Sequence, residues 1–95
     1  MKRCVKITIR GSVQGVGYRH FIQKHAQNLL CEGLIQNRED GSVLAFVCAP
    51  SDKLDELLDF MYLGPEKAKI DEITVEPLPE GRDFRGVFRV IGQNQ

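Results

Sequence analysis

The sequence has no excess of charge of either sign, because its 13 Lys and Arg residues balance its 13 Asp and Glu residues. A neutral chain gives no indication of electrostatic attachment to nucleic acid or to an anionic membrane. The sequence also lacks an apolar run close to the roughly 20 residues that a membrane-spanning helix needs, and no signal-like apolar block follows Met1-Lys2-Arg3. These absences predict a cytoplasmic protein that binds neither nucleic acid nor membrane.

Cysteine is scarce and follows no known pattern. Cys4, Cys31 and Cys48 form no CxxC pair and have no Cys/His spacing typical of zinc, so they predict neither a disulfide framework nor a metal site. The length of 95 residues is near the low end for a chain that folds without such supports, but an apolar content of 42% is ordinary for a globular protein. We therefore expect a single domain over residues 1–95 with one hydrophobic core.

What the sequence does contain is a regular succession of strand and helix patterns. Val5 and Ile7 recur with the period of two that is typical of a half-buried strand, whereas Leu54 and Leu58 follow helical spacing. Gly33 is predicted to stop the first helix. The predicted strands are residues 4–10, 33–38, 42–48, 70–76 and 86–91, and the predicted helices are residues 18–31 and about 51–63.

This order of elements, β-α-β-β-α-β with one late strand in excess, predicts an α+β ferredoxin-like sandwich. Such a fold has an antiparallel sheet of four or five strands with two helices on one face. The third strand lies between the first two, so the ends of the first and second strands meet at one edge of the sheet, about 10 Å apart. The loop that follows residue 10 and the side chain of Asn37 should therefore lie close together.

The loop from Ser12 to Arg19, between the first strand and the first helix, has the composition of an anion-binding site. Gly15 and Gly17 can adopt the backbone turns that direct successive N–H groups at one anion, and the start of a helix adds unsatisfied donors and partial positive charge. Arg19 adds a permanent charge on a planar fork that matches phosphate oxygens. A tight turn followed by a surface arginine is the alternative, and these features alone do not decide between the two.

The order of the residues in this loop and beyond it resembles a known family. Residues 9–19 (IRGSVQGVGYR) resemble the first acylphosphatase signature, with its core G-x-V-Q-G-V-x-aromatic-R. Residues 33–43 (GLIQNREDGSV) resemble the second, which is built around an Asn and a following G-x-V. The resemblance covers roughly the whole chain and is weakest in its last third. The chain departs from the family pattern, in positions that concern packing beside the site, at Tyr18, Leu34, Ile35 and Ala49.

The resemblance implies an enzyme that hydrolyses acyl phosphates to a carboxylate and inorganic phosphate, with Arg19 binding the phosphate and Asn37 orienting the attacking water. The leaving carboxylate has a pKa of about 4 and departs without a proton, so we expect no metal, no cofactor and no acid–base pair. The expected partners are a small acyl phosphate as substrate and inorganic phosphate or a similar anion as product or inhibitor, and the chain is expected to be a monomer. The phosphate-binding loop implied by the resemblance consists of Gln14, Gly15, Val16, Gly17, Tyr18 and Arg19.

Cys4 and Cys48 raise the question of a disulfide. Cys4 begins the first predicted strand and Cys48 ends the third, which are antiparallel neighbours in this fold, and the two side chains share one face of the sheet. Some bacterial proteins of the family that the chain resembles form a disulfide at this place. Two reduced thiols in a reducing cytoplasm are the alternative, and the sequence leaves both open, with Cys31 free in either case.

Other residues near the motifs receive no catalytic assignment. We expect the side chain of Gln14 to brace the loop, His20 to be exposed or packed, and His25 to pack along the first helix. Leu44 and Phe46 share the sheet face away from the predicted helices. They predict a covered patch, a dimer surface or packing by the terminal segment.

Two other functions fit the same scaffold. The first is a non-catalytic anion-binding or regulatory domain, which the presence of both Arg19 and Asn37 disfavours. The second is an RNA-binding module, which needs stacking aromatic residues on its middle strands, whereas the first and third strands offer only Phe46. A related domain also occurs within larger carbamoyl-transfer maturation proteins, but this chain has the length of one domain. The sequence therefore favours a small hydrolase.

Overall fold

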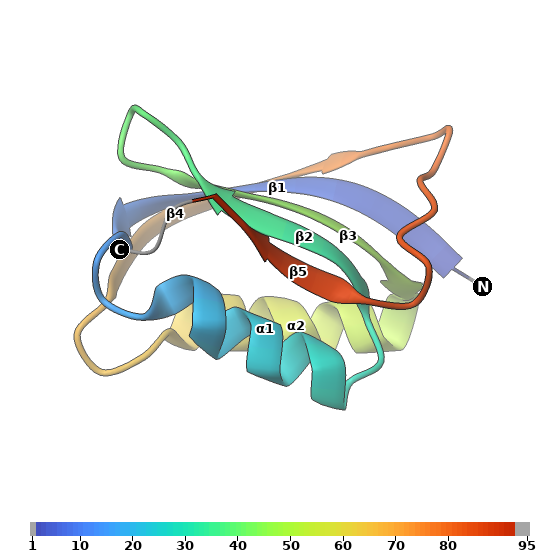
Figure 1. Cartoon of the computed structure of the whole chain (residues 1–95), viewed down its shortest axis with the longest axis horizontal. Helices are drawn as coiled ribbons and strands as arrows, with labels where there is room; N and C mark the ends of the chain where they lie inside the picture. The colour runs from blue at the N-terminus through green and yellow to red at the C-terminus, as the bar shows by residue number, and fades with distance from the viewer. Residues whose placement is uncertain (1, 93–95) are drawn as a thin grey trace.

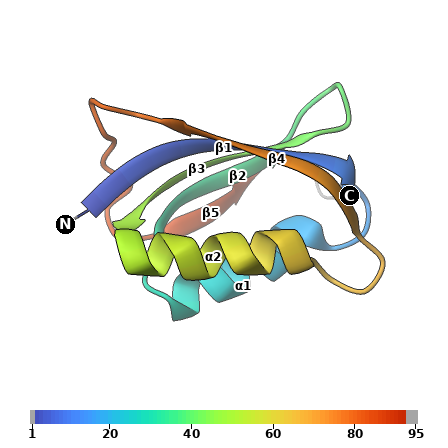
Figure 2. The same ribbon diagram turned by 180° about the vertical axis from the view of Figure 1, so that it is seen from behind.

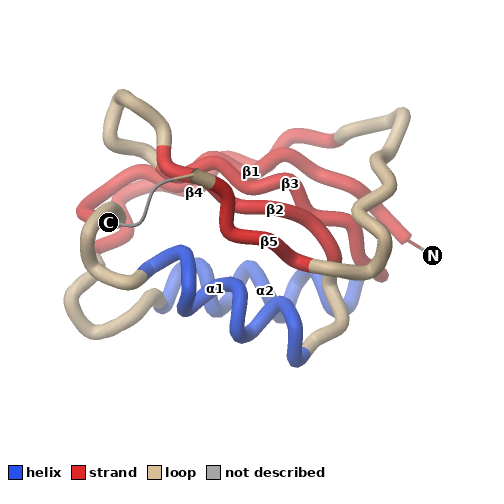
Figure 3. Tube along the Cα trace, viewed as in Figure 1, coloured by secondary structure: helices blue, strands red, loops and turns tan. Residues whose placement is uncertain are grey.

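Seven elements form two layers in the computed structural model, which describes residues 2–92. The elements are β1 (Lys2–Ser12), α1 (Tyr18–Asn28), β2 (Glu32–Asn37), β3 (Val43–Pro50), α2 (Ser51–Leu63), β4 (Lys69–Pro77) and β5 (Phe88–Ile91). The strands form one sheet in the order β4-β1-β3-β2-β5, and both helices cover the same face of it (Figures 1 and 3). The predicted ferredoxin-like α+β fold is thus confirmed. Of the predicted domain 1–95, residues 1 and 93–95 lie outside the described residues.

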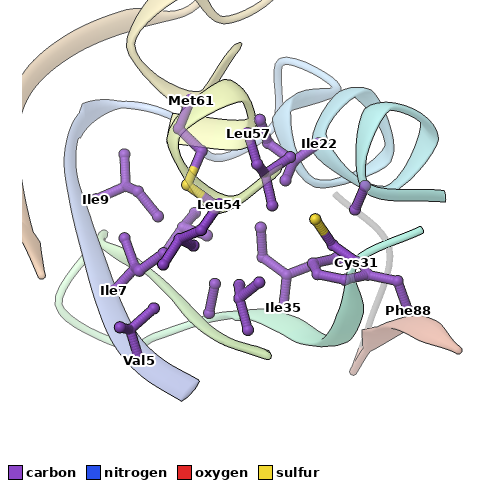
Figure 4. Packing of buried hydrophobic residues seen from close by; sticks show 14 of the residues in the cluster. Val5, Ile7, Ile9, Ile22, Cys31, Ile35, Leu54, Leu57, Met61 and Phe88 are labelled. Carbon is purple, nitrogen blue, oxygen red and sulfur yellow. The ribbon is translucent and has the colours of Figure 1, made fainter. Parts of the chain in front are cut away.

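The core lies between the sheet and the two helices. On β1 the period of two directs Val5, Ile7 and Ile9 toward the helices, and each of them is at most 1% exposed. On α2 the helical period brings Leu57 and Met61 to the same space, where both are fully buried. Figure 4 shows these side chains meeting between the two layers. Within residues 2–92, neither helix has both the length and the apolar character to cross a membrane.

Helix α1 ends before the predicted residue 31, and the chain leaves it at Leu30 rather than at Gly33. Leu30 has a left-handed backbone with φ +60°, and the Cys31 N–H donates to the Ala26 carbonyl oxygen at 2.9 Å, which is the 6→1 bond of a Schellman motif. Gly33 instead lies in β2, where a Cβ would collide with the carbonyl oxygen of Phe46. The glycine that looked like a helix stop therefore serves the close approach of two strands.

One strand pair departs from the expected antiparallel sheet, because β5 runs parallel to β2. β4 and β5 lie at opposite edges of the sheet, and the segment 78–87 crosses from one edge to the other at the end where β1 begins (Figure 2). β5 must therefore run back in the direction of β1 and β2. The carboxylate of Glu32 anchors this crossing, since it accepts from the Gly86 N–H at 2.6 Å and from the ammonium of Lys2 at 2.9 Å. These two donors, Lys2 first, lower the pKa of the Glu32 carboxyl.

The same crossing segment covers part of the sheet face away from the helices. The guanidinium of Arg82 lies over the ring of Phe46, 4.7 Å from its centroid, and Leu44 is only 5% exposed. Cys4 and Cys48 lie opposite each other in the β1–β3 ladder on this face and are joined by a disulfide. Cys31 is free and buried, and burial raises the pKa of its thiol to about 11.

The turn between β2 and β3 is tied to β1 through Asp40. One carboxylate oxygen of Asp40 accepts from the Ser42 hydroxyl at 2.6 Å and from the Ser42 N–H at 2.9 Å. The other lies 3.3 Å from Nη1 of Arg10. The two Ser42 donors, the hydroxyl first, and then Arg10 lower the pKa of Asp40 to about 2. This network fixes the turn that follows Asn37.

Leu30 generates a prediction about stability. Its left-handed conformation costs a residue with a Cβ about 1–2 kcal/mol, and its side chain is 87% exposed, so little packing depends on it. Leu30→Gly should therefore raise the free energy of unfolding by about 0.5–1 kcal/mol after the entropic cost of a glycine is subtracted. Urea denaturation measures the change. The control is Leu63→Gly at an exposed helical position, which should lower stability by up to about 1 kcal/mol. A loss of stability in Leu30→Gly would contradict this account.

Asp40 generates a prediction about pH. Its pKa in the folded chain, about 2, lies below the ordinary value of 3.8, so the folded state holds the proton less strongly than the unfolded state. The stabilisation by Asp40 should be complete above about pH 4 and disappear as the pH falls through about 2. NMR titration of the Asp40 side-chain carbonyl should show a midpoint near 2, and Ser42→Ala should raise it. A wild-type midpoint at the ordinary value would be incompatible with this network.

Candidate active site

The loop between β1 and α1 contains two glycines with a left-handed backbone. Gly15 has φ +74° and Gly17 has φ +79°, whereas Val16 between them has a negative φ. Left-handed residues in a loop of this kind can turn backbone N–H groups toward one side. A Cβ on either glycine would meet nothing within 4 Å, so the backbone conformation, rather than lack of space, requires glycine here.

The start of α1 is open to a negatively charged group. No side chain caps it, and its first turn contains no acidic residue. Within the described chain, the first backbone bond of the helix runs from the Phe21 N–H to the Gly17 carbonyl oxygen at 3.1 Å. In an α-helix the N–H groups that precede the first such bond find no acceptor within the helix, and Tyr18 and His20 contribute two of them here. The unsatisfied donors and the helix dipole together favour an anion at this end.

Arg19 is buried at the start of α1, beside the loop. It is the second residue of α1 and is only 5% exposed, although arginine is almost never buried unless it is paired. Its Nη1 donates to the carbonyl oxygen of Ile91, the last residue of β5, at 2.8 Å. The edge strand therefore fixes the orientation of the guanidinium.

Asn37 is the last residue of β2, and the sheet geometry brings it near the loop as predicted. It is opposite Val43 on β3, which is in turn opposite Ile9 on β1, so one strand separates it from the end of β1. Alternation places its side chain on the helix side together with the buried Ile35. Both polar atoms of the Asn37 side chain are buried, and neither has a hydrogen-bond partner among residues 2–92. An unpaired buried polar group costs about 1–3 kcal/mol, so this amide is not explained by stability.

Arg19 and Asn37 line the same pocket. Its volume of about 390 Å³ is within the range of small-molecule sites, about 300–1,000 Å³. Of the predicted loop residues, Gln14 and Arg19 line it, whereas Gly15, Val16, Gly17 and Tyr18 do not. The complete lining consists of Gln14, Arg19, Gln36, Asn37, Arg38, Glu39, Ile91 and Gly92.

Two side chains hold the parts of this pocket together. Nε2 of Gln14 donates to the carbonyl oxygens of Arg38 and Ser42, both at 2.8 Å, and so joins the loop to the β2–β3 turn. The hydroxyl of Tyr18 donates to the Met61 carbonyl oxygen at 2.8 Å and joins the start of α1 to the end of α2. Burial raises the pKa of this hydroxyl. Neither group is available for proton transfer in the pocket.

The histidines lie outside the pocket. His20 is exposed, and the ring of His25 stacks on Phe60 at a centroid distance of 3.7 Å and meets the edge of Phe21 at 4.7 Å. Residues 2–92 contain no group of three or more His, Cys, Asp or Glu side chains that could hold a metal ion. The side chains that line the pocket offer the guanidinium groups of Arg19 and Arg38, the carboxylate of Glu39 and the amides of Gln14, Gln36 and Asn37.

Ile91 and Arg38 are among the pocket residues that sequence reasoning missed. Ile91 binds Arg19 through its backbone carbonyl oxygen, a group that every residue has, so its side chain carries no signal of this contact. Arg38 was visible as a charged residue directly after Asn37, and its position beside a suspected catalytic residue was the available signal.

Comparison with known proteins identifies the family of the chain. The family model described as Acylphosphatase matches residues 5–90. An acylphosphatase of Caldivirga maquilingensis is 41% identical over 83 residues, which make up 86% of this chain and 87% of that protein. A structure of an acylphosphatase from Coxiella burnetii has a TM-score of 0.88 at 29% identity and covers 95% of this chain and 93% of its own. A crystal structure of acylphosphatase from Bacillus subtilis has a TM-score of 0.89 at 27% identity, with coverage of 97% and 100%. The chain therefore belongs to the acylphosphatase family.

Proposed function

We propose that this acylphosphatase binds the phosphoryl group of a small acyl phosphate between the 12–17 loop, the start of α1 and Arg19, while Asn37 orients the attacking water. The observation that carries the proposal is the meeting of Arg19 and the unpaired amide of Asn37 in one pocket. Each comes from the end of an element that the core holds rigidly. A site of this kind needs such preorganisation.

The phosphoryl group requires donors that match its charge. In the transition state the charge is spread over three equatorial oxygens, so catalysis rests on positioning and on electrostatic stabilisation. The guanidinium of Arg19 offers a permanent charge and several N–H donors. The N–H groups at the start of α1 point toward the same end of the fold. Together they can hold the phosphoryl oxygens in both the ground state and the transition state.

The water requires orientation rather than a base. The leaving carboxylate has a pKa of about 4 and departs as an anion, so the new oxygen–phosphorus bond forms as the bond to the carboxylate breaks. Oδ1 of Asn37 can accept a hydrogen bond from the water and so direct its lone pair at phosphorus. An amide does not keep the proton, and the protons of the water leave on the phosphate product. Hydrolysis of this kind calls for no metal or cofactor.

The product should bind at the same place as the substrate. Inorganic phosphate and similar anions present the same oxygens to Arg19 and the loop, so we expect them to inhibit by competition. The monomeric state, the cytoplasmic location and the single domain over residues 1–95 stay predictions from the sequence.

The first test removes the charge that holds the phosphate. Arg19→Ala should lower kcat/KM for acetyl phosphate by about 10³-fold. Loss of one transition-state donor lowers kcat by about 10²–10³-fold, and an arginine that contacts the transferred phosphoryl group contributes about 10³–10⁵-fold. Phosphate release is measured in the presence of EDTA, with circular dichroism to verify the fold. Arg19→Lys keeps a point charge without the planar fork and should recover only part of the rate. Equal hydrolysis by the wild type and Arg19→Ala would refute the assignment.

The second test removes the unpaired amide. Asn37→Ala should lower kcat by about 10²-fold or more with little change in KM, because the amide acts on the water and not on the phosphate. The same change should leave the free energy of unfolding unchanged or raise it by about 1 kcal/mol, since an unpaired buried group is removed. Steady-state kinetics and urea denaturation measure the two effects. Asn28→Ala, at the exposed end of α1, is the matched control and should not change kcat. A variant that is destabilised but fully active would contradict the role of Asn37.

A further inference from the structure

Arg38 combines a rigid backbone with a guanidinium at the mouth of the pocket. Its N–H donates to the Ser42 carbonyl oxygen at 2.9 Å, and its carbonyl oxygen accepts from Nε2 of Gln14 at 2.8 Å and from the Gly41 N–H at 3.2 Å. The backbone of Arg38 is therefore fixed on three sides. Its side chain is exposed and lines the pocket beside Asn37.

The guanidinium of Arg38 has no hydrogen bond or ion pair with any residue from 2 to 92. The other arginines at this end are engaged, Arg10 with the carboxylate of Asp40 and Arg19 with the carbonyl oxygen of Ile91. The pocket therefore contains, besides Arg19, a second guanidinium, that of Arg38, which makes no side-chain contact of this kind within residues 2–92. Glu39 lines the same pocket, so the charges around a bound ligand are two positive and one negative.

The acyl group of the substrate has to lie in the pocket that Arg38 lines. The volume of this pocket, about 390 Å³, is within the range of sites that hold a whole small molecule. Arg38 lines it together with Arg19 and Asn37. An anionic group on the acyl chain of a bound substrate is therefore within reach of the long side chain of Arg38.

We propose that Arg38 is a specificity residue that binds a second anionic group on the acyl part of the substrate. This inference rests on the proposed function, because it takes the phosphoryl group to be held by Arg19. With the charge of the phosphoryl group met by Arg19 and the loop, a carboxylate or phosphate on the acyl chain meets the planar fork of Arg38, which matches either group. The preferred substrates are then acyl phosphates that carry a second negative charge.

The test compares two substrates of equal chain length. Hexanedioyl monophosphate carries a carboxylate at the far end of its chain, and hexanoyl phosphate carries a methyl group there. The wild type should prefer the first by about three- to fivefold in kcat/KM, which is what an exposed ion pair supplies, and the preference should decline at high ionic strength. The difference should appear in KM, because the second anion takes no part in the chemistry. Equal kcat/KM values for the two substrates would overturn the proposal.

The variants separate a contact with the second anion from a general effect of charge. Arg38→Ala should bring the ratio of the two kcat/KM values to about one, and Arg38→Lys should restore part of it, because a point charge remains. Glu39→Gln should raise the ratio, since it removes a negative charge from the same pocket. Arg3→Ala, an exposed arginine at the opposite end of β1, should leave the ratio unchanged. An equal loss on both substrates in Arg38→Ala would show that Arg38 serves the phosphoryl group or the fold, and would overturn the proposal. Failure of the proposed function is distinct, because then Arg19→Ala would hydrolyse hexanoyl phosphate as fast as the wild type.

Discussion

The insertion of β3 between β1 and β2 is the constraint on which the site depends. Because β3 is antiparallel to both neighbours, β1 and β2 point the same way and end at one edge of the sheet. One intervening strand sets their separation at about 10 Å, so the loop and Asn37 lie one strand apart at the same end of the sheet. Direct pairing of β1 with β2 would halve that distance. Gln14 donates hydrogen bonds to both ends of the β2–β3 turn and so joins this turn to the loop after β1.

The sequence was sufficient for the parts of this arrangement that depend on periodicity or on the composition of one segment. The alternation at Val5 and Ile7 predicts β1, and the order of elements places Asn37 beside the loop. Contacts between backbone groups that are far apart in the chain could not be predicted from the sequence. Gly33 was interpreted as a helix stop, because a close approach to Phe46 leaves no local signal. The bond from Arg19 to the Ile91 carbonyl joins residues 72 positions apart through a group that every residue has. The parallel β5 likewise follows from the path of the 78–87 crossing, which no pattern within β5 reveals.

The fold and the site place opposite demands on polar groups. In the β2–β3 turn, the carboxylate of Asp40 accepts three hydrogen bonds, and its low pKa reports that they favour the charged form. A few residues earlier, the amide of Asn37 is buried with no partner among the described residues. A chain selected for stability alone would not keep such a group. The well-paired turn therefore lies only a few residues from an amide that the described fold leaves unpaired.

The two groups whose pKa is raised by burial, Tyr18 and Cys31, do not line the pocket. The Tyr18 hydroxyl is bound to the Met61 carbonyl and Cys31 lies in the core. Many active sites need shifted pKa values because their reactions move protons. An acyl phosphate already has a leaving group with a pKa of about 4, so a site for its hydrolysis can rely on charges and dipoles that do not change near neutral pH. Arg19, the start of α1 and the amide of Asn37 are groups of this kind, and a small two-layer fold can hold them in position without a dedicated acid or base.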